Sequence, residues 1–231
     1  MGGFFGAVSA NDCILDVFYG TDYHSHLGTR RGGMTSYSAE LGFQRNIHSI
    51  ENSPFRTKFE KDVEKMRGNI CIGCISDTDP QPIMVRSKLG LYAVCSIGII
   101  QNAKALSEEL LENGCANFET MSSGNINSGG LIGALIAQKP TFVEGIRYAQ
   151  SKIEGTMSLV IMTEDSIICA RDKAGKLPIL IGKRSDGYCF SFESFAYQKL
   201  GYETCHELKA GEITKLTKDG YEVLYEGTDE M

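Results

Sequence analysis

The sequence of 231 residues lacks any apolar run of the length that a membrane-spanning helix needs, which is about 18 residues or more. Its N-terminus also lacks the basic region and the longer apolar core of a secretory signal peptide. Lysine and arginine form no stripe and the net charge is −6, so no surface is set up to neutralise nucleic-acid phosphates. We therefore expect a cytoplasmic protein with no membrane partner and no nucleic-acid partner.

A second cysteine or histidine pair is missing beside Cys71-Ile72-Gly73-Cys74, which excludes a structural zinc site. This CxxC lies inside the apolar run 69–75, which predicts a strand, whereas a thioredoxin-like redox motif begins a helix. Most of the eight cysteines stand singly in apolar runs, which favours buried thiols over disulfides. The four histidines are too scattered for a ligand set, and each is interpreted as a surface or core residue: His24, His26, His48 and His206. No metal and no cofactor are expected.

Repeats, low-complexity tracts and proline-rich linkers are also absent, so we expect residues 1–231 to form a single domain. The composition is 42% hydrophobic and 23% charged, which is enough apolar material for a sizeable core.

The order of the expected elements is strands, then helices, then strands. Helices are predicted at 12–27, 54–66, 102–113, 131–138, 141–153 and 193–200. Strands are predicted at 3–10, 34–38, 43–50, 69–75, 82–86, 90–96, 118–121, 156–163, 166–171, 178–183, 187–192, 211–216 and 220–225. In the first helix, Asn11 or Asp12 is the expected N-cap, and the expected apolar stripe is Ile14, Leu15, Val17 and Phe18. Antiparallel hairpins dominate this order, which predicts an α+β fold of two mainly antiparallel sheets with helices outside.

The first residues, Met1-Gly2-Gly3-Phe4-Phe5-Gly6, place two apolar side chains between glycines and lead into a strand. This opening resembles that of class II glutamine amidotransferases, N-terminal-nucleophile (Ntn) hydrolases whose chains begin Met-Cys-Gly-Ile-Phe-Gly. Leu27 through Gly33 resembles the segment of that family in which an arginine-containing turn closes the glutamine pocket, with Arg31-Gly32 on its Arg-Gly. Outside this resemblance, the glycine-rich turn at 28–33 fits neither a dinucleotide loop nor a P-loop.

Later motifs most resemble the glutaminase domain of amidophosphoribosyltransferases. They are Gly155-Thr156-Met157-Ser158-Leu159-Val160, the stretch from Arg171-Asp172 through Gly175 to Pro178-Ile179, and Ser191-Phe192-Glu193-Ser194. These motifs also have structural interpretations: a salt-bridged Arg171–Asp172 pair, a turn with positive φ at Gly175, and a first-turn helix acid at Glu193. The resemblance spans nearly the whole chain and implies a four-layer αββα Ntn-hydrolase sandwich.

The catalytic positions depart from the family pattern. Gly2 stands where the family has its nucleophilic cysteine, and Ser76 stands where an arginine pairs with the glutamine carboxylate. Ile97-Gly98-Ile99 replaces the Asn-Gly-Asn that stabilises the oxyanion, and Asn127 replaces the aspartate that binds the substrate amine. Glutamine is a zwitterion that needs a cation and an anion to hold it, and Ser76 and Asn127 supply neither. The resemblance therefore assigns no catalytic residue, and it implies a vestigial substrate pocket at Arg31, Ser76, Gly98 and Asn127.

Natural degeneration explains these losses better than a single engineered change at Gly2, which would leave the other positions intact. The favoured interpretation is a domain that is inactive as a glutaminase and acts in binding, regulation or assembly. One alternative is the glutaminase half of a longer amidophosphoribosyltransferase that uses free ammonia in purine synthesis. The acidic diphosphate-binding loop of a phosphoribosyltransferase is absent from these residues, so that domain is not expected in this chain.

A third alternative is a remodelled Ntn amide hydrolase with another nucleophile. Asp77 and Asp79 would suit acid–base chemistry beside a carboxyl group such as Asp12 or Glu51, but nothing in the sequence brings them together. The partners left open are a small-molecule ligand, a phosphoribosyltransferase domain and a second copy in a homo-oligomer.

Overall fold

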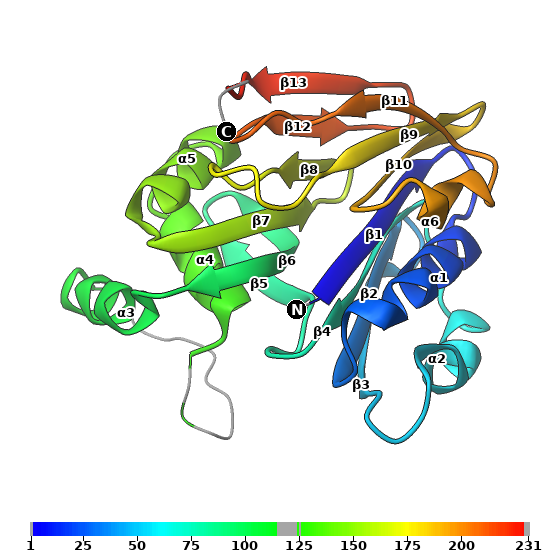
Figure 1. The fold of residues 1–231 in the computed structure, drawn as a ribbon, viewed down its shortest axis with the longest axis horizontal. Helices are drawn as coiled ribbons and strands as arrows, with labels where there is room; N and C mark the ends of the chain where they lie inside the picture. The colour runs from blue at the N-terminus through cyan, green and yellow to red at the C-terminus, as the bar shows by residue number, and fades with distance from the viewer. Residues whose placement is uncertain (1, 115–123, 125, 229–231) are drawn as a thin grey trace.

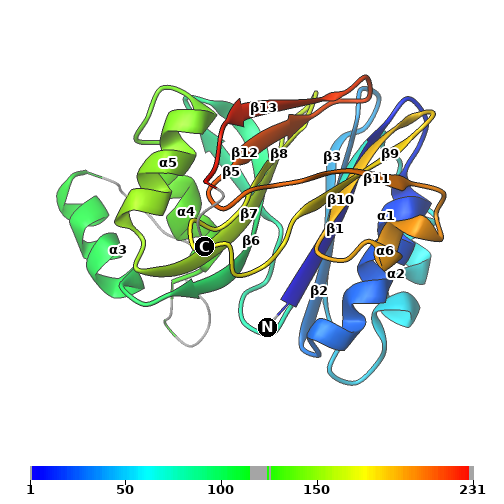
Figure 2. The same ribbon diagram turned by 45° about the horizontal axis from the view of Figure 1, so that its top comes forward.

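Four layers make up the fold, which we describe from a computed structural model for residues 2–114, 124 and 126–228. Two antiparallel sheets face each other, and helices cover the outer face of each sheet (Figure 1; Figure 2). The predicted α+β sandwich with helices outside is thereby confirmed. In the described part of the chain, no helix combines the length and the apolar character needed to cross a membrane.

The first sheet has seven strands with β1 near its middle. In spatial order they are β11 (Glu203–Glu207), β9 (Leu180–Arg184), β10 (Gly187–Ser191), β1 (Gly2–Ser9), β4 (Ile70–Ser76), β2 (Arg31–Ser38) and β3 (Gly42–Ser49). The second sheet has six strands: β13 (Tyr221–Tyr225), β12 (Ile213–Leu216), β8 (Ile167–Ala170), β7 (Gly155–Met162), β6 (Gly90–Ile100) and β5 (Ile83–Ser87).

Helices α1, α2 and α6 lie on the first sheet, and α3, α4 and α5 lie on the second (Figure 2). Their bounds are α1 (Ile14–Tyr23), which continues into the 3-10 turn η1 (His24–Leu27), α2 (Phe55–Val63), α3 (Ala103–Glu112), α4 (Ser128–Ile136), α5 (Phe142–Lys152) and α6 (Phe195–Gln198).

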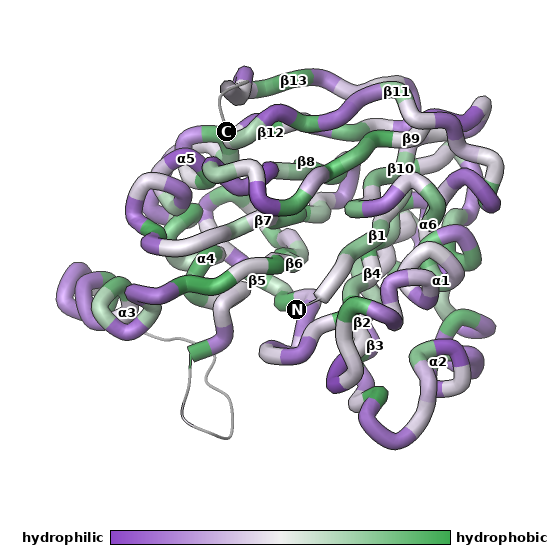
Figure 3. The backbone as a smooth tube through the Cα atoms, viewed as in Figure 1, coloured by the Kyte–Doolittle hydropathy of each residue, from purple (hydrophilic) through white to green (hydrophobic). Residues whose placement is uncertain are grey.

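The alternation of side chains along β1 explains why this strand is central. Phe4 and Val8 lie in the core between the sheets, while Phe5 and Ala7 lie in the core under α1 and α2. All eight residues of β1 are buried. Apolar segments therefore meet in the interior while polar segments lie outside, as the hydropathy colouring shows (Figure 3).

Some boundaries differ from the sequence-based predictions. The N-cap of α1 is Cys13, and the expected cap Asp12 instead accepts hydrogen bonds from the Ile14 and Gly68 amides. Leu15, expected on the buried stripe, is 56% exposed. Strand β6 does not end before Gly98 but runs through it to Ile100, because glycine fits the close approach of β7 at that point.

Three further differences concern chain regions rich in glycine or polar residues. Helix α4 begins at Ser128, three residues before the expected start, because Asn127 caps it. Helix α6 is only four residues long. Strand β11 was not predicted, because this edge strand is mostly exposed and its polar sequence shows no alternation. The strand predicted at 118–121 lies outside the described residues.

The cysteines follow the core interpretation. Seven free cysteines are described, and six of them are buried: Cys13, Cys71, Cys74, Cys95, Cys169 and Cys189. Cys205 is exposed. Burial raises the pKa of the Cys95 and Cys169 thiols well above the ordinary value, which makes them unreactive packing residues.

Candidate functional site

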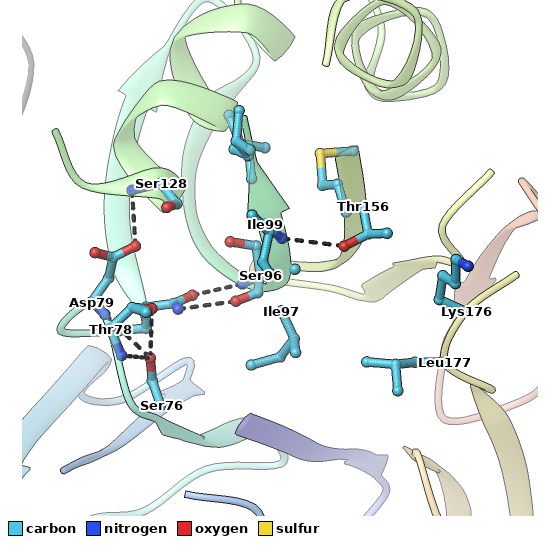
Figure 4. A pocket seen from close by; sticks show the side chains of 15 residues that line it. Ser76, Thr78, Asp79, Ser96, Ile97, Ile99, Ser128, Thr156, Lys176 and Leu177 are labelled. Carbon is cyan, nitrogen blue, oxygen red and sulfur yellow. Dashed lines mark hydrogen bonds between the residues drawn. The ribbon is translucent and has the colours of Figure 1, made fainter. Parts of the chain in front are cut away.

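A cavity of about 400 Å³ lies where strands β4, β6 and β7 and the start of helix α4 converge (Figure 4). This volume falls in the range of small-molecule pockets, roughly 300–1,000 Å³. The residues that line it are Ser76, Thr78, Asp79, Gln81, Ser96, Ile97, Gly98, Ile99, Ile100, Ser128, Ile132, Thr156, Met157, Lys176 and Leu177. Two of the predicted pocket residues, Ser76 and Gly98, are therefore brought together here.

Ser76 ends β4 and is 3% exposed. Its hydroxyl oxygen accepts hydrogen bonds from the amides of Thr78 and Asp79, each at 3.2 Å. The side chain thus closes a turn at the end of the strand. It provides no positive charge where the resemblance places an arginine.

Gly2, the position that the resemblance assigns to the nucleophile, pairs with Ser76 across β1 and β4. A Cβ atom added to Gly2 would lie less than 3.0 Å from both the Ile75 carbonyl oxygen and Cδ1 of Ile97. Real Cβ atoms do not approach other heavy atoms so closely. The space beside Gly2 is therefore closed by a neighbouring backbone and by an isoleucine side chain.

The segment Ile97-Gly98-Ile99 lies in β6 opposite β7. Gly98 pairs with Met157, and a Cβ at Gly98 would collide with the Thr156 backbone. The Ile99 amide donates to the Thr156 hydroxyl at 3.2 Å. Ile97 is 8% exposed and belongs to the core between the sheets, whereas Ile99 is 70% exposed and also lines the cavity. Aliphatic groups thus occupy the positions of the two family asparagines.

Asn127 and Arg31 do not line the cavity. Asn127 is fully buried as the N-cap of α4, where its side-chain oxygen accepts the Gly129 and Gly130 amides and its nitrogen donates to the Pro80 carbonyl. Arg31 is the first residue of β2, exposed, and in register with Ser76 of β4. The predicted set of Arg31, Ser76, Gly98 and Asn127 remains a prediction as a vestigial substrate pocket.

The sequence-based site prediction did not include Asp79, Gln81 and Lys176, which also line the cavity. Asp79 is 3% exposed, and its Oδ2 accepts the Ser128 amide at 3.1 Å. The side-chain amide of Gln81 pairs with the backbone of Ser96 through two hydrogen bonds, of 2.6 and 2.9 Å. Lys176 is exposed and lies on the side of the cavity away from Asp79 (Figure 4). The sequence singled out Asp79 only as one half of an acid–base pair.

The cavity offers no sign of an activated nucleophile. Its hydroxyl groups come from serines and threonines, and the described residues that line it include no histidine. Histidine is the usual base that activates a serine. Within the described residues, no group of three or more histidine, cysteine, aspartate or glutamate side chains is placed to hold a metal ion.

The stretch from Arg171 to Ile179 has the structural role that the sequence predicted. Arg171 and Asp172, however, bind other partners and not each other. The Arg171 guanidinium donates to the carbonyls of Leu177, Gly175 and Leu208 and pairs with Glu207 at 3.3 Å. The Asp172 carboxylate accepts the Met157 and Ala174 amides. Gly175 has the predicted positive φ, of 63°.

Glu193 lies two residues before α6 and binds side chains of α1 and η1. Its carboxylate accepts the Tyr23 hydroxyl and contacts His26, at 3.1 and 3.0 Å. His24 is fully buried and His26 is exposed, although their ring centroids lie only 6.5 Å apart. The two histidines therefore have the core and surface roles that the sequence favoured.

Comparison with known families matches residues 66–198 to the "Glutamine amidotransferase domain". The chain is similar to the amidophosphoribosyltransferase of Archaeoglobus fulgidus, with 26% identity over 88% of this chain and 45% of the relative. It is 32% identical to the amidophosphoribosyltransferase of Staphylococcus epidermidis, over 87% of this chain and 38% of the relative. The chain thus spans less than half the length of the curated relatives described here.

Among solved structures, the fold is similar to that of glutamine phosphoribosylpyrophosphate amidotransferase from B. subtilis in complex with ADP and GMP. The TM-score is 0.83 at 24% identity, over 96% of this chain and 48% of that one. This likeness confirms the predicted four-layer architecture.

Proposed function

Because this chain belongs to the glutamine amidotransferase domain family, we propose that it is an amidophosphoribosyltransferase-like domain that has lost glutaminase activity. In this proposal the domain acts through binding, either of a small molecule or of a partner domain, and does not release ammonia from glutamine.

The observation that carries the proposal is the closed space at Gly2. Glycine has no side chain to attack an amide, and a Cβ there would collide with the Ile75 carbonyl and with Ile97. The neighbouring residues have thus filled the volume that a nucleophile would need. Loss of a nucleophile costs about 10⁶-fold in turnover in well-studied hydrolases. The isoleucine at position 97 further removes a donor from the oxyanion position, which costs roughly 10²–10³-fold.

The charges around the cavity support the same proposal. Holding the α-carboxylate of glutamine takes a cation at the Ser76 end of the cavity. Lys176, the one cation among the described lining residues, lies on the other side (Figure 4), and Arg31, although in register with Ser76, does not line the cavity. Asn127 stands at the position of the family's amine-binding aspartate, but its side chain caps α4. A zwitterionic amino acid therefore finds neither partner in its expected place.

A glutamine-mimicking diazo-ketone tests this proposal. We expect no covalent adduct on the purified protein after prolonged incubation, because the reagent needs an activated N-terminal thiol. Intact-mass measurement followed by peptide mapping reads the result. A related amidotransferase that retains its N-terminal cysteine serves as the positive control. An adduct on any residue at the cavity would refute the proposal, and it would instead favour a remodelled Ntn hydrolase.

A second candidate function follows from the length of the relatives. Since the chain spans less than half of them, we propose as an alternative that it works beside a phosphoribosyltransferase half, using free ammonia, in purine synthesis in the cytoplasm. That half would be encoded by an in-frame continuation of the gene or by a separate interacting chain. Ammonia-dependent formation of phosphoribosylamine by the assembled protein decides for this alternative, and its absence with a candidate partner decides against it.

A further inference from the structure

The polar end of the cavity contains oxygen atoms that can accept further hydrogen bonds. Of the fifteen lining residues, only Asp79 and Lys176 carry ionisable side chains. Asp79 is 3% exposed and uses Oδ2 for the Ser128 amide. Its other carboxylate oxygen has no hydrogen-bond partner within the described ranges. Ser96 is 7% exposed, and its hydroxyl likewise has no partner in the part of the chain that the structure describes. The Asp79 carboxylate therefore offers the cavity an oxygen that can still accept a hydrogen bond.

An anionic group does not suit this end of the cavity. The first amides of α4 would attract an anion, but the side chains of Asp79 and Asn127 already accept hydrogen bonds from Ser128, Gly129 and Gly130. A ligand carboxylate or phosphate here would also face the negative charge of Asp79.

The remaining walls are aliphatic. Ile97, Ile99, Ile132, Met157 and Leu177 line the space between the Asp79 end and Lys176. Ile99 is one of these lining residues and is 70% exposed overall. An aliphatic ligand body would cover Ile99 and gain about 25 cal/mol for each Å² of apolar surface removed from water. The cavity therefore combines one anionic, acceptor-rich end with an apolar body.

We propose that this cavity binds a small aliphatic primary amine, with its ammonium group on Asp79 and its hydrocarbon chain against Ile97, Ile99 and Met157. The ammonium group would donate to the Asp79 carboxylate, and a charge-assisted hydrogen bond is about twice as strong as a neutral one. The inference rests on the proposed function, because a working glutaminase would need this space for glutamine.

A matched series of six-carbon probes tests the proposal: n-hexylamine, n-hexanol and hexanoate, measured by titration calorimetry at pH 7 in low salt. These probes share one chain and differ in the head group. We expect hexylamine to bind at least about tenfold more tightly than hexanol, and hexanoate to bind more weakly than either.

Asp79→Asn locates the effect. Asparagine can still accept the Ser128 amide, so α4 stays capped, but the charge is lost. The preference for hexylamine over hexanol is expected to disappear while the affinity for hexanol stays unchanged. Asp165→Asn is the control, because it removes the same charge from the turn between β7 and β8, where Asp165 accepts hydroxyl hydrogen bonds away from the cavity.

Equal affinities for hexylamine and hexanol in the unaltered protein would overturn the proposal, and so would no binding of either. Tighter binding of hexanoate that depends on Lys176, or an amine preference that survives Asp79→Asn, would also overturn it. If Asp79→Asn does not fold, the series on the unaltered protein still decides. Glutamine hydrolysis is measured separately, so a failure here is distinguishable from a failure of the proposed function.

Discussion

Replacing Gly2 with cysteine is expected to leave the protein without measurable glutamine hydrolysis and to lower its free energy of unfolding by about 1–3 kcal/mol. The new Cβ would collide with the Ile75 carbonyl oxygen and with Cδ1 of Ile97. A thiol at this position would also lie opposite Ser76, which carries no charge to hold the glutamine carboxylate. Ammonia release from glutamine and chemical denaturation measure the two effects.

Gly220→Cys is the matched control for this variant. A Cβ at Gly220 meets no heavy atom within 4 Å, so the same side chain is added in open space. Its stability is expected to stay within about 0.5 kcal/mol of the unaltered protein. Saturable ammonia release by Gly2→Cys would show that the site had lost only its nucleophile. Ser76, Ile97 and Ile99 would then still permit glutamine binding and hydrolysis.

Acidification from pH 6.5 to pH 4 is expected to remove about 3 kcal/mol of stability through His24. The ring is fully buried under the first sheet. Its Nδ1 contacts the Gly20 carbonyl at 2.7 Å, and its Nε2 contacts the Ser191 hydroxyl at 3.1 Å. Burial lowers the pKa of His24 from 6.5 to about 4, because the charged ring cannot be solvated there.

The sign of this pH dependence follows from which state, folded or unfolded, binds the proton. Above pH 6.5 the ring is neutral in both the folded and the unfolded chain, so this residue gives no pH dependence. Between pH 6.5 and 4 the unfolded chain takes up a proton that the folded protein does not, so stability falls as the pH falls. Below pH 4 both states are protonated and the loss through His24 is complete.

Urea denaturation across this pH range, compared with His24→Gln, isolates the contribution. The variant is expected to be less stable at pH 7 but to lose about 3 kcal/mol less on acidification. His26→Gln is the control, because His26 is exposed and contacts Glu193 at the surface. If the free energy of unfolding of His24→Gln falls with pH as steeply as that of the unaltered protein, groups other than His24 cause the loss of stability in acid.

The fold was largely predictable because its signal is local and repeated. The alternation of apolar residues and the turn residues located most strands, and hairpin order gave two antiparallel sheets. The prediction failed where local pattern and tertiary contact disagree. Gly98 looked like a strand end, but β7 passes so close that only glycine fits within a continuous β6. Strand β11 has no apolar alternation, because it is an exposed edge.

The candidate site was only partly predictable. Ser76 and Gly98, which the family motifs singled out, line the cavity, and the sheet register brings Gly2 beside Ser76. Asp79 was not assigned to the site, because its role depends on α4, which begins 49 residues later in the sequence. Lys176 lies in a loop whose path is fixed by the Arg171 contacts, and residue spacing alone carries no information about that path.

Glutamine hydrolysis by the unaltered, purified protein tests the central claim most directly. Ammonia release should be followed by a coupled dehydrogenase assay at saturating glutamine, after mass spectrometry has identified the N-terminal residue. We expect no release above the rate of a heat-denatured sample. Saturable release of ammonia, proportional to protein concentration and retained through successive purification steps, would contradict the account.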